Sequence, residues 1–514
     1  MSAAKTAAPK KTFMQRLLDA VEVAGNKVPH PAIIFLALIA IVVVLSHLLY
    51  LMGTSVTYQV VNPDTDQVEQ ATSTARSLLT ADGVRFMFTS VVQNFMSFNA
   101  VGVIIVAMVG VGVAEESGLV KTLIKKLVLV SPPAALTYIL VFVGIVSSIA
   151  ADAGYLVLIP LAAAAFISVG RHPLAGLAAS FAGVAAAFGV NVLIKPLDGI
   201  LTEITNDAIH LLNPSISIDL AANFWFSAAS VLLLTVVIAL ITERIIEPRL
   251  GPYGGEAPVE EGASMSAAET RGLRWSNWAL LATLLLFALL TFPPGAPLRH
   301  PETGAIIGNS PLMNGLIVVI AAVFLAMGIA YGYGARTLTS TTEVINAIVK
   351  TIASLSGLIF LLLIISQFLA YFNYSNMATL AAVKLADALK SANLPPLLLL
   401  LGFVVVVFLL DLIITGAIPK WAIFAPIFVP LLMKLNVAPE AVLAAYRVGD
   451  SPVNAISPLN AYFAMIVAFA QRYQKDAGVG TVVALMLPYV AIISVLWILL
   501  LAFWYLLGLP WGLG

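Results

Sequence analysis

Long apolar segments recur through this chain from Pro31 to Leu509, and they restrict its fold more than any other feature. Several of them, such as residues 31–52 and 313–333, reach the roughly 20 residues that an α-helix needs to cross the hydrocarbon core of a bilayer. The chain is 61% hydrophobic and only 10% charged, whereas soluble domains carry about a quarter charged residues. The sequence therefore predicts an all-α polytopic membrane protein.

Several other classes of protein are disfavoured. The formal net charge is zero, so the charge balance does not favour nucleic acid as a partner. The chain has no cysteine and its five histidines are scattered singly, so no disulfide framework, haem or zinc site is expected. A membrane enzyme or proton-translocating subunit would need clustered ligands or chains of buried lysine and glutamate, and no such pattern is present. We therefore expect neither an enzyme nor a resident cofactor.

Two apolar segments, residues 131–170 and 395–434, differ from the rest because each contains two short arms. An arm of about 15–17 residues is short for a full crossing. Polar or small residues join the arms at 147–154 in the first segment and at 415–420 in the second. Each segment is therefore predicted to form a re-entrant hairpin.

A helix that begins with proline and then breaks follows each hairpin. The first begins at Pro173 and breaks at residues 191–199, and the second begins at Pro439 and breaks at residues 451–460. Broken backbone inside a membrane is tolerated only where protein or a water-filled cavity satisfies it. The unbroken spans are predicted at about 31–52, 86–113, 222–242, 276–293, 313–333, 346–372 and 481–507. With the two broken helices they make about nine transmembrane helices.

The distribution of basic residues supports this topology. With the N-terminus in the cytoplasm, 17 of the 26 Lys and Arg residues fall in cytoplasmic segments and six in outside segments. An excess of basic residues in cytoplasmic loops is typical of membrane proteins. The remaining three, Lys195, Lys420 and Arg447, fall within the membrane, where charge is costly and usually functional.

The two units of hairpin and broken helix are predicted to be inverted repeats. Prolines and polar residues occur in the same order in both units. The first unit ends with Asn191, Pro196, Leu197 and Asp198, and the second ends with Asn454, Pro458, Leu459 and Asn460. An odd number of crossings separates the units, so their hairpins open to opposite sides. Inverted repeats with discontinuous helices are typical of secondary transporters, whose site lies near the midplane.

The helix breaks also supply candidate ligands. Exposed N–H groups at a half-helix N-terminus suit a carboxylate or another anion. Freed carbonyls and side-chain oxygens suit a small hard cation such as Na⁺, and the candidate oxygens belong to Asp198, Asn191, Asn454, Ser148 and Ser457. Asp198 can equally cap the helix that resumes after the first break.

Charged and aromatic residues of the second repeat have alternative interpretations. Arg447 and Asp450 are one helical turn apart, so they can pair with each other. Such a pair either fixes the fold only or serves as a gate or proton site. Lys420 and Trp421, at the second hairpin tip, either anchor an interface or bind an aromatic, acidic solute. Asp411 precedes this tip, and the sequence does not indicate its partner.

Several segments resemble the AbgT family, the p-aminobenzoyl-glutamate transporters, and the resemblance covers essentially the whole chain. The segments that carry it are VAMVGVGVAEESGL (106–119), DAGYLVLIPLAAA (152–164), GRHPLAGLAASFAGV (170–184), NVLIKPLD (191–198), SQFLAYFNYSN (366–376), PKWAIFAPIFVPLL (419–432) and AAYRVGDSPVNAISPLNAYF (444–463). The last two are highly specific.

The resemblance implies a bowl-shaped homodimer in the bacterial inner membrane, with an inner transport core and an outer frame in each protomer. It implies five parts, namely a cytoplasmic N-terminus (1–30), frame helices with an interfacial segment (31–130), a first core repeat (131–221), frame helices with a cytoplasmic linker at 243–273 (222–394), and a second core repeat with the last helix (395–514). The implied function is uptake of p-aminobenzoyl-glutamate or export of sulfonamide antimetabolites, driven by a cation gradient.

The resemblance also implies substrate-binding residues. They are Asp198, Trp421, Pro439, Arg447, Asp450 and Pro458, with Asn191 and Asn454 at the helix breaks. Trp421 would stack on the aromatic ring of the solute, and Asp450 could carry a proton. The chain departs from the family pattern at Ile418, where a hydroxyl residue is expected, and at Lys195, where a small residue is expected.

The residues leave three functional alternatives open. The first is transport of aromatic carboxylates or sulfonamides, coupled to Na⁺ or H⁺. The second is a sodium-coupled symporter for dicarboxylate-type anions. The third is a passive channel, against which the inverted repeat argues. Neither the direction of net transport nor the coupling ion can be read from the residues.

Overall fold

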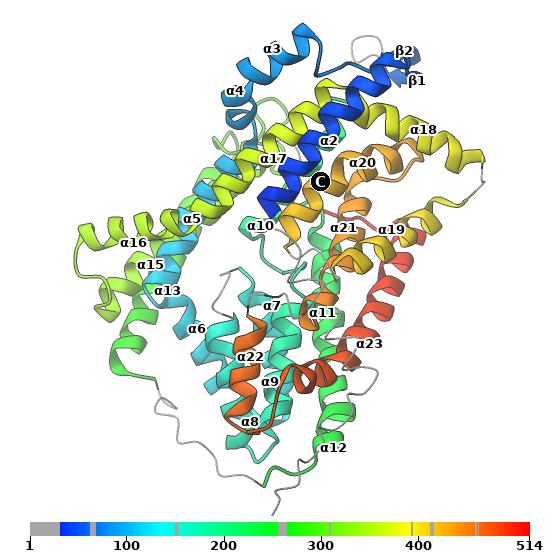
Figure 1. The fold of residues 1–514 in the computed structure, drawn as a ribbon. Coiled ribbons are helices and arrows are strands. Elements are labelled where there is room, and N and C mark those ends of the chain that lie inside the picture. Colours follow the sequence, from blue (N-terminus) through cyan, green and yellow to red (C-terminus); the bar gives the residue numbers. More distant parts are fainter. Residues whose placement is uncertain are drawn as a thin grey trace, which may run out of the picture.

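The structure, a computed structural model, describes residues 31–61, 68–149, 154–254, 265–307, 310–391, 394–411, 416–457, 460 and 462–513. Nearly all regular structure in these residues is helical (Figure 1). Eight helices are long and apolar enough to cross a membrane, with α11 and α12 counted as one. They are α2 (Pro31–Leu51), α5 (Asn99–Glu116), α11 (Phe224–Ile241) continued by α12 (Glu247–Leu250), α13 (Ala267–Thr291), α15 (Leu316–Ala335), α17 (Ser356–Tyr374), α20 (Ala417–Lys434) and α23 (Val479–Leu506). The predicted class, an all-α polytopic membrane protein, is confirmed.

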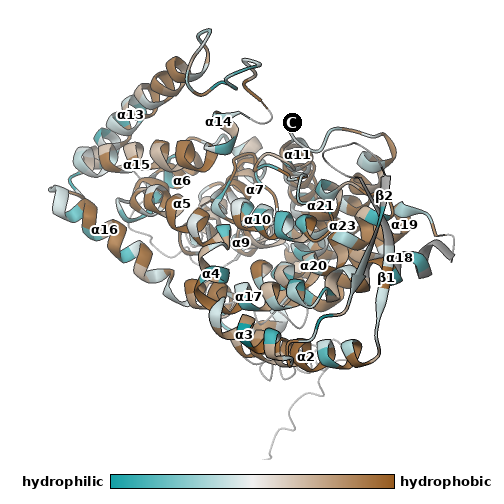
Figure 2. Cartoon of the chain, turned by 90° about the horizontal axis from the view of Figure 1, so that it is seen from above, coloured by the Kyte–Doolittle hydropathy of each residue, from teal (hydrophilic) through white to brown (hydrophobic). Residues whose placement is uncertain are grey.

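Helix α13 shows why such helices need a membrane. Leu281, Leu285 and Leu289 follow one another at four-residue spacing, and they are 57%, 61% and 60% exposed. Leaving each of these side chains in water costs about 1.5–3 kcal/mol relative to burial. Helix α13 lies at one edge of the molecule in the view from above (Figure 2). This edge is therefore suited to lipid or to another protein chain.

The polar segment after α2, predicted as a loop, contains a small β-hairpin. Strands β1 (Ser55–Val61) and β2 (Val68–Thr74) pair in antiparallel register. In β1, Val56 alternates with Ser55 and Thr57, and this period of two is typical of a strand. The prediction of a loop was wrong here because it weighed polarity and not alternation.

Two predicted spans are divided into shorter helices. The span predicted at 86–113 consists of α3 (Ala81–Thr89), α4 (Val91–Met96) and α5, and the span at 346–372 consists of α16 (Thr341–Ser354) and α17. Between α3 and α4, the Ser90 hydroxyl donates to the Phe86 carbonyl at 2.7 Å, a local bond that competes with regular helix. The remaining helices outside the two repeats are α6 (Leu119–Leu129), α14 (Pro311–Asn314) and α18 (Met377–Ser391).

Each predicted repeat appears as a pair of helices followed by two half-helices, and of the four paired helices only α20 is long and apolar enough to cross a membrane. The first repeat contains α7 (Leu136–Ser147), α8 (Ile159–Ser168), α9 (Pro173–Phe181) and α10 (Pro196–His210). The second contains α19 (Pro396–Asp411), α20, α21 (Pro439–Asp450) and α22 (Phe463–Gln471). Two broken helices, α9–α10 and α21–α22, and the long helices other than α20 correspond to the nine predicted crossings.

Glycine contacts reveal the same packing in both repeats. Gly183 lies ten residues after Pro173, and Gly449 lies ten residues after Pro439. A Cβ atom at Gly183 would lie 2.8 Å from the carbonyl oxygen of Val141, and one at Gly449 would lie 2.8 Å from that of Val404. In each repeat, therefore, the first arm of the helix pair packs closely on the first half-helix through an equivalent glycine.

The two short-helix pairs open toward opposite ends of the molecule, and α11 shows this directly. At the start of α12, which continues α11, Glu247 binds the Arg171 guanidinium, at the base of the first pair, at 2.7 and 2.8 Å. Near the start, the Asn223 amide, just before α11, donates to the Glu440 carbonyl at 2.9 Å, at the base of the second pair. At 1.5 Å per residue, these contacts are about 36 Å apart. The opposite orientation is as predicted, whereas re-entry of the pairs into a membrane stays a prediction.

Candidate functional site

The two helix breaks meet in the interior. The Gly189 N–H, just before the first break, donates to Ser451 Oγ at 2.9 Å, and the Gly189 carbonyl accepts from Arg447 Nη1 at 2.8 Å. Ser451 Oγ in turn donates to the Arg447 carbonyl at 2.7 Å. Residues more than 250 positions apart in the chain thereby form one junction.

An ion pair between Asp198 and Arg447 lies at this junction. Arg447 Nη1 is 2.6 Å from Asp198 Oδ1, and Arg447 Nε donates to Asn223 Oδ1 at 3.2 Å. The other Asp198 oxygen accepts from the Lys195 N–H at 2.9 Å, so the residue also caps α10. The arginine is only 4% exposed. The pairing of Arg447 with Asp450 suggested by their spacing is wrong, because each finds a partner on another element.

The partner of Asp450 is Lys420, which also contacts Asp411. Lys420 Nζ lies 2.5 Å from Asp450 Oδ1, and all three side chains are at most 3% exposed. Lys420 is therefore not an interfacial anchor. Both Asp411 oxygens are buried without a hydrogen bond of good geometry, although the ion-pair contact to Lys420 is present. Two carboxyl groups thus share one ammonium group, and with both ionised the cluster carries a net charge of −1.

Tyr446 links this cluster to the backbone. Its hydroxyl lies 2.5 Å from the Ala417 carbonyl oxygen and 3.0 Å from Asp450 Oδ1. A hydroxyl has one hydrogen, so it can donate to only one of these two acceptors. Tyr446 thereby connects Asp450 with the start of α20.

A buried lysine, Lys195, lies on the side of the first repeat, and we call this lysine and the groups around it the positive corner. Asn191 Nδ2 donates to Ser148 Oγ at 3.0 Å and to the Val146 carbonyl at 3.1 Å, which fixes the end of α7 against the first break. Lys195, 1% exposed, contacts the Phe188 carbonyl oxygen and lies 3.4 Å from Ser148 Oγ. No carboxylate among the described residues lies within ion-pair distance of its ammonium group.

Other predicted residues of the second break are only partly brought together. Asn454 Nδ2 donates to the Asp450 carbonyl at 3.1 Å, and Ser457 is buried. Pro439 begins α21, eight residues before Arg447, which corresponds to about 12 Å along the helix. Pro458 lies outside the described residues.

Trp421 is fully buried and already engaged. Its Nε1 donates to Thr205 Oγ1 at 3.0 Å and to the Leu201 carbonyl at 3.1 Å, both on α10. Its ring lies 4.6 Å from that of Tyr446. Stacking on a solute stays a prediction.

Sequence reasoning missed Gly189, Ser451 and Tyr446. Tyr446 lies one turn before Asp450, a spacing that could have indicated their contact. Gly189 and Ser451 are small residues beside the breaks, and nothing in their local sequence indicates that they meet. Among the described residues, no group of three or more His, Cys, Asp or Glu side chains is placed to hold a metal ion.

Replacing Gly189 with alanine should disrupt this junction. The added Cβ would lie 2.3 Å from Ser451 Oγ, a short side chain held by two hydrogen bonds. We expect the free energy of unfolding to fall by about 1–3 kcal/mol, the usual cost of overpacking. Thermal unfolding in detergent measures this loss of stability. Gly102→Ala is the control, because a Cβ there meets no atom within 4 Å. Equal stability of the two variants would contradict the proposed packing.

Known proteins resemble this chain over nearly its full length. The model of the AbgT putative transporter family matches residues 16–514. The p-aminobenzoyl-glutamate transport protein of Escherichia coli (strain K12) is 33% identical over 506 residues, which cover 98% of each chain. The name of this relative and the description of the family both refer to transporters.

Two solved structures share the fold. The YdaH transporter of Alcanivorax borkumensis is 41% identical, with a TM-score of 0.88 over 94% of this chain and all of that chain. Neisseria gonorrhoeae MtrF, described among antimetabolite efflux pumps, is 38% identical, with a TM-score of 0.91 over 97% of this chain and all of that chain. With the inverted helix pairs and the two broken helices that meet at buried charges, these matches establish that the chain belongs to the AbgT family of putative transporters.

Proposed function

We propose that this protein is a secondary active transporter, and not an enzyme, for aromatic carboxylates resembling p-aminobenzoyl-glutamate. Export of sulfonamide antimetabolites is the other activity that its relatives suggest, since one is named for p-aminobenzoyl-glutamate transport and another is described among antimetabolite efflux pumps. A gradient of Na⁺ or H⁺ would drive transport. The protein would lie in the bacterial inner membrane as a homodimer, with its N-terminus in the cytoplasm.

The observation that carries this proposal is the separation of buried charge at the two breaks. Lys195 forms a positive corner near Asn191, which suits a carboxylate. The cluster of Asp411, Lys420 and Asp450 has one more acidic group than basic, which suits a cation or a proton. The core thus offers buried groups of both signs, as a carrier that couples an anion to a cation requires.

The repeat symmetry supports the cation assignment. Ser148 lies 15 residues after Pro133, and Asp411 lies 15 residues after Pro396, so they are equivalent at the ends of α7 and α19. Oxygens of the first repeat and carboxylates of the second would therefore face the same region. We assign substrate binding to Asp198, Trp421, Pro439, Arg447, Asp450, Pro458, Asn191 and Asn454, and cation binding to Asp198, Asn191, Asn454, Ser148 and Ser457 together with Asp411.

Transport would proceed by motion of the core against the surrounding helices. The core consists of residues 131–221 and 395–514, and the frame consists of residues 31–130 and 222–394. A sodium-coupled carrier of non-aromatic dicarboxylates would use the same charges, and the choice of labelled solute distinguishes it. A passive channel would show the same flux whether or not an ion gradient is imposed.

The test is transport by purified protein in sealed liposomes. Labelled p-aminobenzoyl-glutamate, a labelled sulfonamide and a labelled aliphatic dicarboxylate are each offered under an imposed Na⁺ or H⁺ gradient. We expect one aromatic solute to follow one gradient, and Asp411→Asn to reduce that response at least tenfold. Asp82→Asn serves as control, because this aspartate is 81% exposed in a surface pair. Gradient-independent flux, or an unchanged response in Asp411→Asn, would contradict the proposal.

A further inference from the structure

The ammonium group of the positive corner lies where two helix ends meet at the first break. Lys195 is 1% exposed and immediately precedes α10. Its ammonium group contacts the Phe188 carbonyl oxygen, and it lies 3.4 Å from Ser148 Oγ and 4.7 Å from the centre of the Phe188 ring. A carbonyl oxygen, a hydroxyl oxygen and an aromatic face all attract a cation. The surroundings of this position are therefore suited to a positive charge.

Both oxygens belong to the C-terminal ends of helical segments. Ser148 is the C-cap of α7, and Phe188 lies two residues after the π-helical segment Ala182–Ala186, which continues α9. The C-terminal end of a helix carries a partial negative charge from its free carbonyl groups. In carriers with broken helices, unwound carbonyls and half-helix C-terminal ends coordinate Na⁺. Lys195 thus places its ammonium group where such a carrier would bind Na⁺.

The Ser148 hydroxyl is oriented as a ligand for this cation. It donates its hydrogen to the Ile145 carbonyl at 2.8 Å, and it accepts from Asn191 Nδ2 at 3.0 Å. A hydroxyl oxygen has two lone pairs, so the second one is left for the Lys195 ammonium group. Removing this group would free one acceptor position on Ser148 and one on Phe188, which a small cation could fill.

The balance of buried charge supports the same role. Among the described residues, six Asp, Glu, Lys and Arg side chains are buried, namely Asp198, Asp411, Asp450, Lys195, Lys420 and Arg447. Three of them are acidic and three are basic, so with all six ionised they carry no net charge. Without Lys195 the net charge would be −1. An uncompensated buried charge is costly, so a cation such as Na⁺ would then be needed.

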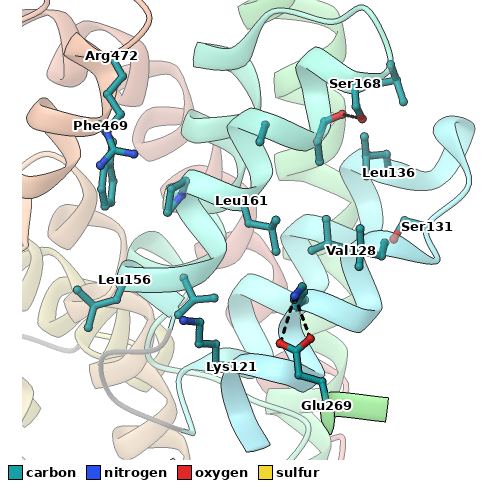
Figure 3. A pocket seen from close by; sticks show the side chains of 17 residues that line it. Lys121, Val128, Ser131, Leu136, Leu156, Leu161, Ser168, Glu269, Phe469 and Arg472 are labelled. Atoms are coloured by element: carbon teal, nitrogen blue, oxygen red, sulfur yellow. Dashed lines mark hydrogen bonds and ion pairs between the residues drawn. The ribbon is translucent and has the colours of Figure 1, made fainter. Parts of the chain in front are cut away.

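The ammonium group is also separated from solvent. A cavity of about 590 Å³ lies between α6, α8 and α22, and Lys121, Leu161 and Arg472 belong to its lining (Figure 3). Lys195 does not line this cavity, and almost none of its surface is exposed. Its charge is therefore stabilised by protein groups and not by water, as a permanent occupant of a cation site requires.

We propose that the Lys195 ammonium group is a tethered cation that occupies the Na⁺ position of the first repeat. The inference rests on the proposed function and narrows it, because transport by the wild-type protein then does not respond to Na⁺, and H⁺ is the coupling ion. Two of the three ammonium hydrogens are used by Phe188 and Ser148, so the third is available to a substrate carboxylate. The tethered cation thus binds the two helix ends and attracts the anion, as a bound Na⁺ would.

The experiment asks whether removal of the ammonium group creates a Na⁺ site. Lys195→Ala removes the charge and leaves space, whereas Lys195→Met removes the same charge and fills the space. Equilibrium binding of labelled Na⁺ is measured on purified protein, and thermal unfolding is compared in NaCl and in choline chloride of equal ionic strength. For Lys195→Ala we expect about one bound Na⁺ per protomer and, at about 100 times Kd, a Tm about 2–3 °C higher in NaCl. The wild-type protein and Lys195→Met should show neither effect.

A pair of double variants tests the oxygen ligand. Lys195→Ala/Ser148→Ala lacks the hydroxyl that faces the ammonium group, so its Kd for Na⁺ should be about tenfold higher than that of Lys195→Ala. Lys195→Ala/Ser147→Ala is the matched control, because Ser147 is also buried at the end of α7 but donates to the Gly144 carbonyl at 2.7 Å. Equal affinity of the two double variants would show that Ser148 does not hold the ion.

Four further results would overturn the tethered cation. They are binding of Na⁺ or Na⁺-driven transport by the wild-type protein, no binding of Na⁺ by Lys195→Ala, equal binding by Lys195→Met, and a Lys195→Ala protein that does not fold even in NaCl. Equal binding by Lys195→Met would place the ion at the cluster of Asp411 and Asp450 instead. A wild-type protein that transports none of the labelled solutes would contradict the proposed function. Binding of Na⁺ requires no solute, so it would still decide this inference.

Discussion

Replacing Arg447 with methionine should abolish transport and lower the free energy of unfolding by about 3–5 kcal/mol. The change removes the partner of Asp198 and leaves a buried carboxylate without compensation. It also removes the hydrogen bonds from Arg447 to Gly189 and Asn223, which join three separate segments. Unfolding is followed by circular dichroism during titration with SDS, and transport is measured in liposomes.

A second variant separates charge from packing at this pair. In Arg447→Met/Asp198→Asn the uncompensated charge is gone, so about half of the lost stability should return, while transport stays absent. Arg85→Met is the control, because Arg85 is 75% exposed in a surface pair with Asp82 and such pairs contribute only about 0–1 kcal/mol. If Arg447→Met unfolds like Arg85→Met, the ion pair does not hold the junction together.

Replacing Lys420 with methionine should lower the free energy of unfolding by a similar amount, for a different physical reason. The change leaves Asp411 and Asp450 close together without the cation between them, so their repulsion adds to the cost of burial. We expect the free energy of unfolding to fall by about 3–5 kcal/mol at neutral pH. Adding Asp411→Asn removes one of the two charges and should recover at least half of the lost stability.

The same unfolding titration measures the Lys420 variants. Lys350→Met is the matched control, because Lys350 pairs with Glu116 at 2.6 Å but is 71% exposed. Lys420→Met with the stability of this control would show that Lys420 does not neutralise the two carboxylates. Failure of Asp411→Asn to restore stability would show that packing, and not charge, dominates at this position.

Much of the fold follows from local patterns. Prolines at the starts of half-helices, such as Pro173 and Pro439, and the short length of paired arms predicted both repeats, because proline position and helix length act within a few residues. The boundaries were less accurate: helical structure before the first break ends at Ala186, although the pattern predicted Val190. Apolar residues continue past Ala186, and hydropathy does not detect that the backbone has already changed.

The site was predicted as a set of residues but not as a set of contacts. Asp198 and Arg447 do lie together where the breaks meet, and Asn191 binds the end of α7. The partners of Arg447 and Asp450 were predicted from helical spacing, whereas Asp198 and Lys420 lie 249 and 30 residues away in the chain. Charge pairing over such separations is decided by tertiary packing, about which local spacing carries no information. The same limit explains why Lys420 was open to interpretation as an anchor.

The bonds from Gly189 to Ser451 and Arg447 also have a mechanical consequence. They cross the boundary between the halves that the internal symmetry relates, and the indole bonds from Trp421 to α10 cross it again. Two halves joined in this way cannot separate like a hinge without breaking the whole polar centre. We therefore expect the two halves to move as one body, with the sliding surface where this body touches its surroundings.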